Sequence, residues 1–62
     1  GDVLRKYRMK RGVTQEQVAE KLGITKSSWS MYEQGKRTPR DEVKIKIAHY
    51  FQTTVEEIFF KQ

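Results

Sequence analysis

The sequence predicts an all-α fold of five short helices, and three observations support that prediction. Glycine or proline interrupts the chain at Gly12, Gly23, Gly35 and Pro39. Each glycine is followed within three residues by a threonine that can cap the start of a helix, and apolar residues between the interruptions recur at helical spacing. No stretch of strand length alternates between apolar and polar residues, so we expect no sheet.

The first two helices are expected at about 3–11 and at 15–22. Gly12 stands where a helix C-terminal glycine would, because glycine adopts positive φ at little cost. Thr14 and Gln17 fit a capping box, in which each side chain satisfies a backbone amide beside the other. The residues expected to turn inward are Leu4 and Tyr7 in the first helix, and Val18, Ala19 and Leu22 in the second.

The third and fourth helices are expected at about 26–34 and 40–51. Thr25 and Thr38 are their candidate N-caps. Pro39 suits the first turn of the fourth helix, because its missing amide would be unpaired there anyway. The residues expected to turn inward are Trp29 and Tyr32 in the third helix, and Val43, Ile47, Ala48 and Phe51 in the fourth.

The last helix is short and is expected at 55–60. Thr54 precedes it and stands three residues before Glu57, which fits a second capping box. No glycine marks this junction, so the break before it rests on the cap alone. The residues expected to turn inward are Val55, Ile58 and Phe59.

The composition excludes several classes of protein. A chain of 62 residues holds one domain, 1–62, and we expect Gly1 to derive from cloning rather than from the natural protein. The absence of cysteine excludes disulfide scaffolds, thiolate metal sites and cysteine nucleophiles. His49 is the only histidine and has no further ligands at metal-binding spacing, so we expect no metal, no cofactor and no catalytic residue. The longest apolar run is too short to span a membrane.

Positive charge is unevenly distributed along the chain. Thirteen lysines and arginines against eight acidic residues give a net charge of +5. Positive residues concentrate at 5–11 and after Gly35, whereas 14–24 is net negative, and this polarity favours a cationic patch. A basic small domain is a candidate for binding nucleic acid or an anionic membrane, although composition alone fits an ordinary solvated surface equally well.

The middle of the chain has the pattern of two helices joined by a tight turn. Ala19 is a small residue on the inner face of the expected second helix, Gly23 falls in the turn, and Ile24 follows as an apolar plug. Close packing of two helices around a tight turn needs a small residue, a glycine and an apolar plug at such offsets. The pattern therefore predicts a helix-turn-helix.

With this motif the chain resembles the Cro/repressor-type helix-turn-helix proteins, the lambda-repressor-like DNA-binding domains of the XRE family. The resemblance extends from Leu4 to Phe59 and implies a compact five-helix domain in which the second and third helices form the motif. It rests on Arg8, the runs 12–15 and 18–23, Glu33, Gly35, Lys36, Arg37, Pro39, Ile47 and Ala48.

The resemblance implies that the third helix is a recognition helix lying in the major groove. Lysine can donate to guanine, serine can pair with several base edges, and methionine can contact a thymine methyl, although an ordinary solvated face is the alternative for the serines. The expected base contacts are Lys26, Ser27, Ser30 and Met31. The expected phosphate contacts are Gln15, Ser28, Gln34, Lys36, Arg37 and Arg40, with plain surface charge as the alternative for the two arginines.

The resemblance also implies a buried or half-buried ion pair between Arg8 and Glu33, which orients the recognition helix and does not touch bases. The chain departs from the family at Trp29, which stands where a branched aliphatic residue is usual and should displace the recognition helix slightly. Loss of either charge of the pair would leave the other unpaired, so we interpret both residues as structural.

The expected fourth helix departs from the family pattern as well. Asp41 and Lys44 stand at positions that are usually apolar. Val43 and Ile45 can compensate if the inward face is rotated, which would leave Ile45 exposed.

We therefore expect a transcriptional regulator that binds double-stranded DNA, specifically a repressor that binds a palindromic operator as a homodimer. Its expected location is the cytoplasm of a bacterium or of a phage-infected cell. The alternative is a protein-interaction module, antitoxin-like or adaptor, on the same fold with weak or lost DNA binding. The surface expected to hold the second copy is formed by Ile45, Tyr50, Val55, Phe59 and Phe60, unless the aromatic residues simply close the core.

Overall fold

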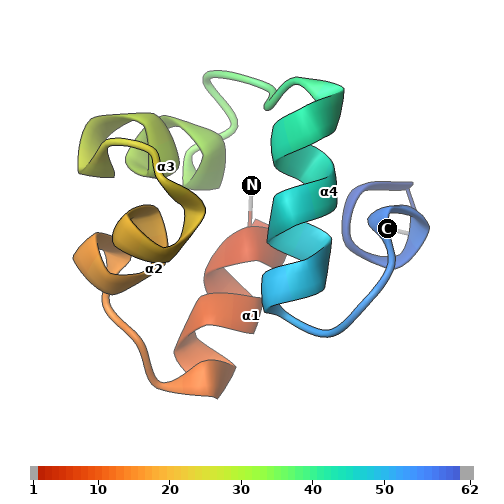
Figure 1. Ribbon diagram of the computed structural model, residues 1–62, viewed down its shortest axis with the longest axis horizontal. Helices are drawn as coiled ribbons and strands as arrows, with labels where there is room; N and C mark the ends of the chain where they lie inside the picture. Colours follow the sequence, from red (N-terminus) through yellow and green to blue (C-terminus); the bar gives the residue numbers. More distant parts are fainter. Residues whose placement is uncertain (1, 61–62) are drawn as a thin grey trace.

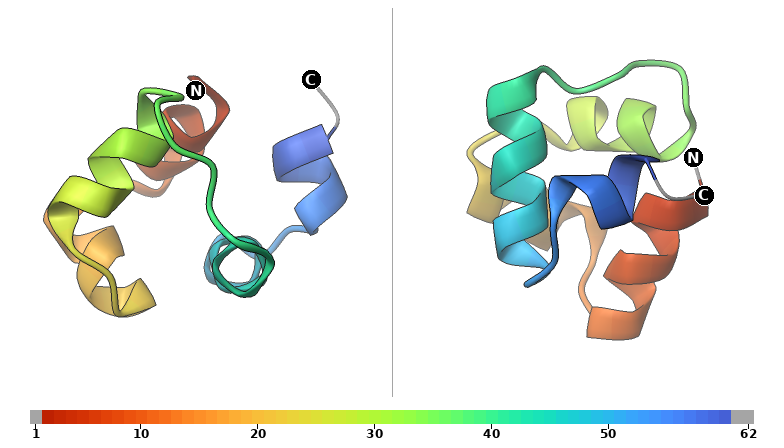
Figure 2. Two further views of the ribbon diagram at one scale, coloured as in Figure 1. Left: turned by 90° about the horizontal axis from the view of Figure 1, so that it is seen from above. Right: turned by 90° about the vertical axis from the view of Figure 1, so that its right-hand side faces the viewer.

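The computed structural model of the chain describes residues 2–60, and all of the regular secondary structure within that range is helical. Its elements are α1 (Asp2–Arg11), α2 (Gln15–Leu22), α3 (Lys26–Glu33), α4 (Asp41–Tyr50) and the π-helical segment η1 (Glu56–Phe60). α2 and α3 lie on one side of the molecule and η1 on the other, with α4 and α1 between them (Figures 1 and 2). The all-α prediction is confirmed, and no helix within residues 2–60 is long and apolar enough to cross a membrane.

The helix-turn-helix is built by local caps. The amide of Thr14 donates to Gln17 Oε1 at 2.9 Å and the amide of Gln17 donates to Thr14 Oγ1 at 3.1 Å, so the predicted capping box starts α2. Gly23 ends α2 at φ 72°, a left-handed conformation that favours glycine. The amide of Ile24 then donates to Ala19 O at 3.0 Å, which closes the turn before α3.

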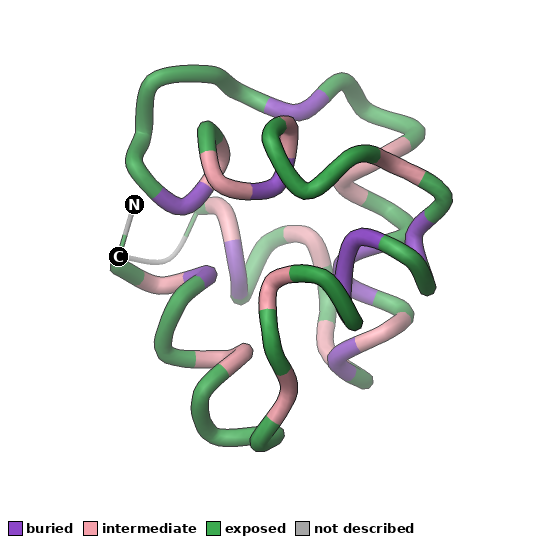
Figure 3. The backbone as a smooth tube through the Cα atoms, turned by 90° about the vertical axis from the view of Figure 1, so that its left-hand side faces the viewer, coloured by how far each residue is buried: buried purple, intermediate pink, exposed green. Residues whose placement is uncertain are grey.

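The start of α4 corrects the predicted cap. Arg40 is the N-cap, in an extended conformation with no side-chain hydrogen bond, so Thr38 does not cap the helix and Pro39 lies outside its first turn. The helix begins instead at two acidic residues, Asp41 and Glu42, whose charges are favourable in the first turn of a helix. The connection from 34 to 38 is exposed throughout, and Pro39 is the buried residue that returns it to the core (Figure 3).

The core is a single apolar cluster around Trp29, whose side chain is 0% exposed. The ring centroid of Trp29 lies 6.3 Å from that of Phe51 and 6.5 Å from that of Tyr32. Val43 packs against the cluster whereas Ile45 is 53% exposed, as expected for a rotated inward face of α4. The buried members of the cluster are Leu4, Val18, Ala19, Leu22, Trp29, Ile47, Phe51 and Ile58.

Candidate nucleic-acid interface

The N-terminus of α3 is fixed by Thr25, the residue before the helix. Thr25 Oγ1 accepts a hydrogen bond from the amide of Ser28 at 3.1 Å and donates one to Ser28 Oγ at 3.0 Å. The burial of Trp29 fixes the rotation of α3 about its own axis. The Thr25 cap and the buried Trp29 together determine which side chains of α3 face outward.

The outward side of α3 gathers the four residues predicted to contact bases. Lys26, Ser27 and Met31 are exposed, and Ser30 is half-buried. Together with Gln15 from the start of α2, they line a shallow hollow on the surface. We call these five residues the reading face.

The residues predicted to contact phosphate fall in several places. Gln15 belongs to the reading face itself. Ser28 is half-buried beside the N-terminus of α3, and Lys36 follows its C-terminus, where the amide of Lys36 donates to Met31 O at 3.0 Å. Arg40 is exposed at the start of α4. Arg37 is also exposed but lines a different hollow, next to Pro39, so the structure does not bring it into the reading face.

An ion pair between Arg8 and Glu33 joins α1 to the end of α3. Arg8 Nε donates to Glu33 Oε2 at 2.5 Å, and Arg8 Nη1 donates to the carbonyl of Val13 at 2.9 Å. Both side chains are largely withdrawn from solvent, with 15% and 6% exposed. The pair therefore links α1, the connection to α2, and α3 behind the reading face.

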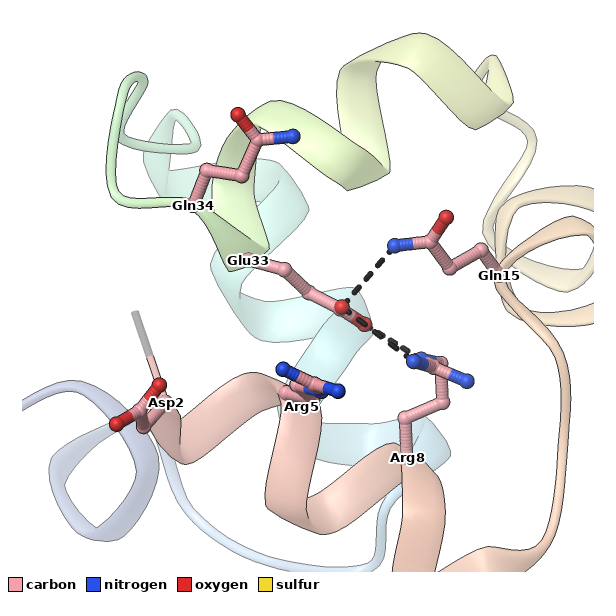
Figure 4. Close-up of a pocket in the computed structure, with 6 residues that line it drawn as sticks. All are labelled: Asp2, Arg5, Arg8, Gln15, Glu33 and Gln34. Carbon is pink, nitrogen blue, oxygen red and sulfur yellow. Dashed lines mark hydrogen bonds and ion pairs between the residues drawn. The ribbon is translucent and has the colours of Figure 1, made fainter.

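Two further donors complete the surroundings of Glu33, and reasoning from the sequence missed both. Trp29 Nε1 donates to Glu33 Oε2 at 2.5 Å, and Gln15 Nε2 donates to Glu33 Oε1 at 3.1 Å (Figure 4 shows the bonds from Arg8 and Gln15). The four-residue spacing from Trp29 to Glu33 within one helix was a usable signal. The bond from Gln15 had no sequence signal. We call Arg8, Gln15, Trp29 and Glu33 the Glu33 cluster.

The ionisation of Glu33 reflects this cluster. Burial alone would raise the pKa of its carboxyl group. The hydrogen bonds from Arg8, Gln15 and Trp29, together with the charge of Arg8, outweigh that effect and hold the pKa below its ordinary value. Glu33 is therefore a carboxylate at neutral pH.

The lowered pKa predicts a pH dependence of stability. A carboxyl group with a depressed pKa in the folded state contributes stability above its unfolded pKa of about 4.3 and loses it as pH falls through the folded pKa. We expect the difference in unfolding free energy between the unchanged chain and Glu33→Gln to be largest near neutral pH and to shrink below about pH 4. Urea denaturation across this range measures it. A difference that stays constant down to pH 3 would contradict the assignment.

Arg5 is a further cation next to this site. It is exposed on α1, one turn before Arg8, and lines a hollow with Gln15, Glu33 and Gln34 (Figure 4). Within the basic start of the chain, reasoning from the sequence singled out Arg8 but gave no role to Arg5.

The residues predicted for a dimer interface are divided between two hollows. Ile45 and Tyr50 line one beside the C-terminal end of α2, and Arg11 Cζ lies 4.4 Å from the ring centroid of Tyr50. Phe59 and Phe60 line another, where Lys44 Nζ lies 5.5 and 5.1 Å from their ring centroids. Val55 is half-buried and lines neither hollow. Phe60 is the most exposed of the five, at 67%.

Comparison with known proteins agrees with this architecture. A family model described as helix-turn-helix matches residues 4–58. An HTH-type transcriptional regulator of Archaeoglobus fulgidus is 36% identical over 56 residues, which are 90% of this chain and 80% of that protein. One of Methanocaldococcus jannaschii is 38% identical over 56 residues, 90% of this chain and 85% of that protein. The cryptic phage CTXphi transcriptional repressor RstR of Vibrio cholerae is 31% identical over 55 residues, 89% of this chain and 50% of that protein. Similar proteins thus occur in archaea as well as in a bacterial phage.

Proposed function

Because the chain belongs to the XRE family of helix-turn-helix transcriptional regulators, we propose that it is a repressor that binds a palindromic operator as a homodimer. The observation that supports sequence-specific binding is the reading face, which joins a cation, hydroxyl groups and an apolar side chain on one exposed side of α3. The presence of a phage repressor among the similar proteins supports the repressor role.

The chemistry of the reading face fits the edges of bases in the major groove. Lys26 can donate to guanine O6 or N7, and the hydroxyl of Ser27 can pair with either donors or acceptors. Met31 has no polar head and suits the methyl group of thymine. At the start of α2, the unpaired amides of the first turn and the helix dipole favour a phosphate beside Gln15.

The apolar residues of the C-terminal half support the proposed second copy. Ile45 is 53% exposed and Phe60 is 67% exposed, and both are large side chains that gain by leaving water. A two-fold symmetric pair would place two copies of α3 about one helical turn of DNA apart. Sedimentation should show a dimer on the best duplex, and one chain per duplex would contradict the dimer while leaving DNA binding intact.

The experiment that tests the proposal is selection from a pool of random duplexes, followed by titration of the winning site against salt. We expect a palindrome, and a plot of the logarithm of the binding constant against the logarithm of salt concentration with a slope of several units. The slope arises because lysine and arginine side chains that bind phosphates release the counterions condensed on the DNA. Weak, salt-sensitive binding with no enriched sequence would contradict a sequence-specific regulator and would favour the protein-interaction module.

Two lysines at different places on this surface should have different roles in binding. Lys26→Ala should relax the preference at one base position and cost about 1–3 kcal/mol of binding free energy on the best site. Lys36→Ala should weaken all sites alike and reduce the salt slope by about one unit. Lys21→Ala is the matched control, since Lys21 is exposed but lines the hollow beside Ile45. Indistinguishable sequence preferences in all three variants would contradict base contact by Lys26.

A further inference from the structure

Ser30 on the reading face is hydrogen-bonded by a side chain one turn further along the chain. Gln34, exposed at the C-terminal cap of α3, donates from Nε2 to Ser30 Oγ at 2.8 Å. Figure 4 shows the amide nitrogen of Gln34 turned toward α3 and its oxygen turned away. Within residues 2–60, Ser30 Oγ has no other hydrogen bond.

This contact changes what the hydroxyl of Ser30 offers to a base. A serine hydroxyl has one proton and two acceptor positions, and its proton rotates to suit the partner. A free serine therefore pairs with base donors and base acceptors alike. The amide of Gln34 occupies one acceptor position and excludes the rotamer that would point the proton there. Accepting this bond also polarises the hydroxyl and makes its proton a better donor.

We propose that Gln34 is a positioning residue for specificity: by donating to Ser30, it presents the Ser30 hydroxyl to the major groove as a hydrogen-bond donor. The inference rests on the proposed binding of DNA by the reading face. It assigns to the base opposite Ser30 an acceptor on its major-groove edge, such as guanine O6 or N7 or thymine O4. Cytosine, which offers only its N4 amino donor there, is disfavoured at that position.

The test is the substitution Gln34→Glu, which keeps the length of the side chain but turns a donor into an acceptor. The carboxylate can only accept, so the Ser30 proton must turn toward it and leave lone pairs facing the groove. Selection from random duplexes should then show a changed preference at one base position. There the enrichment of cytosine or adenine, which offer amino groups, should rise by about three- to tenfold relative to the other bases. All other positions of the consensus should keep their order.

The control variants separate this effect from charge. In a Ser30→Ala background, adding Gln34→Glu should weaken binding generally and move no base preference. Gln34→Ala should broaden the preference at the same position, because a released hydroxyl pairs with donors and acceptors. Gln34 is exposed, so thermal unfolding of Gln34→Ala should nearly match that of the unchanged chain, and Gln34→Glu should be slightly less stable because its charge lies at the C-terminal end of α3.

Two failures are distinguishable. If the unchanged chain enriches no sequence, the proposed function fails. If it enriches a site and Gln34→Glu enriches the same base at every position, DNA reading stands and the role of Gln34 is overturned. A uniform loss of affinity in Gln34→Glu, with no changed base preference, would also overturn the role of Gln34, because loss of a phosphate contact would have the same effect.

Discussion

Replacing Arg8 by methionine is expected to lower the free energy of unfolding by about 3–5 kcal/mol. The substitution keeps an unbranched side chain but removes the cation that faces the buried carboxylate of Glu33 at 2.5 Å. Gln15 and Trp29 still donate to that carboxylate, but neither neutralises its charge. A domain of 62 residues has a total stability of about 3–9 kcal/mol, so the thermal midpoint should fall by roughly 15 °C or more.

Arg5→Met is the matched control for this prediction. Arg5 lies on the same helix one turn earlier but is exposed, so its loss should change the unfolding free energy by no more than about 0.5 kcal/mol. Urea denaturation of both variants measures the difference. The double variant Arg8→Met/Glu33→Leu should lose less than Arg8→Met alone, because it leaves no buried charge unpaired. Equal losses of unfolding free energy in the Arg5 and Arg8 variants would show that the ion pair between Arg8 and Glu33 contributes no more to stability than an exposed charge does.

The boundaries of α2 were predictable because the groups that set them are close in sequence. Thr14 and Gln17 stand three residues apart, and Gly23 supplies the positive φ that closes the helix. The N-cap of α4 was predicted wrongly because threonine is a better capping residue than arginine by local propensity. The helix nevertheless begins after Arg40, which makes no side-chain cap hydrogen bond. The π-helical hydrogen bonding of Glu56–Phe60 has no signature in the apolar spacing, which indicated only a helix.

The candidate site was predictable as a set of surface positions but not as a network. Once Trp29 is turned inward, helical geometry places Lys26, Ser30 and Met31 outward, and the structure brings them together. The bond from Gln15 to Glu33 joins residues that are far apart in the sequence, so its existence depends on how α2 and α3 pack. The same limit applies to the proposed dimer surface, whose members were grouped by apolar character and are divided between two hollows.

Trp29 occupies the centre of this packing, and Trp29→Ala is expected to cost about 3–5 kcal/mol of unfolding free energy. The substitution opens a cavity in the core and removes the Nε1 donor at 2.5 Å from Glu33 Oε2. This loss is a large part of the stability expected for so small a domain, so urea and thermal denaturation should show midpoints far below those of the unchanged chain. Unchanged denaturation midpoints would contradict the central place of Trp29 in the core.

Trp29→Phe removes the hydrogen bond with a smaller loss of core volume than alanine. It keeps an aromatic ring in the core but removes the donor, and we expect a loss of at least about 1–3 kcal/mol, because a charged acceptor loses a partner and the smaller ring leaves part of the core unfilled. Tyr32→Phe is the control, since the Tyr32 hydroxyl makes no hydrogen bond within residues 2–60, and its loss should stay near zero. With one donor fewer, the pKa of Glu33 should also rise toward its ordinary value, so acid should remove less stability from Trp29→Phe than from the unchanged chain. If Trp29→Phe costs no more than Tyr32→Phe and leaves the pH dependence unchanged, the indole donor does not hold Glu33, whose partners are then Arg8 and Gln15.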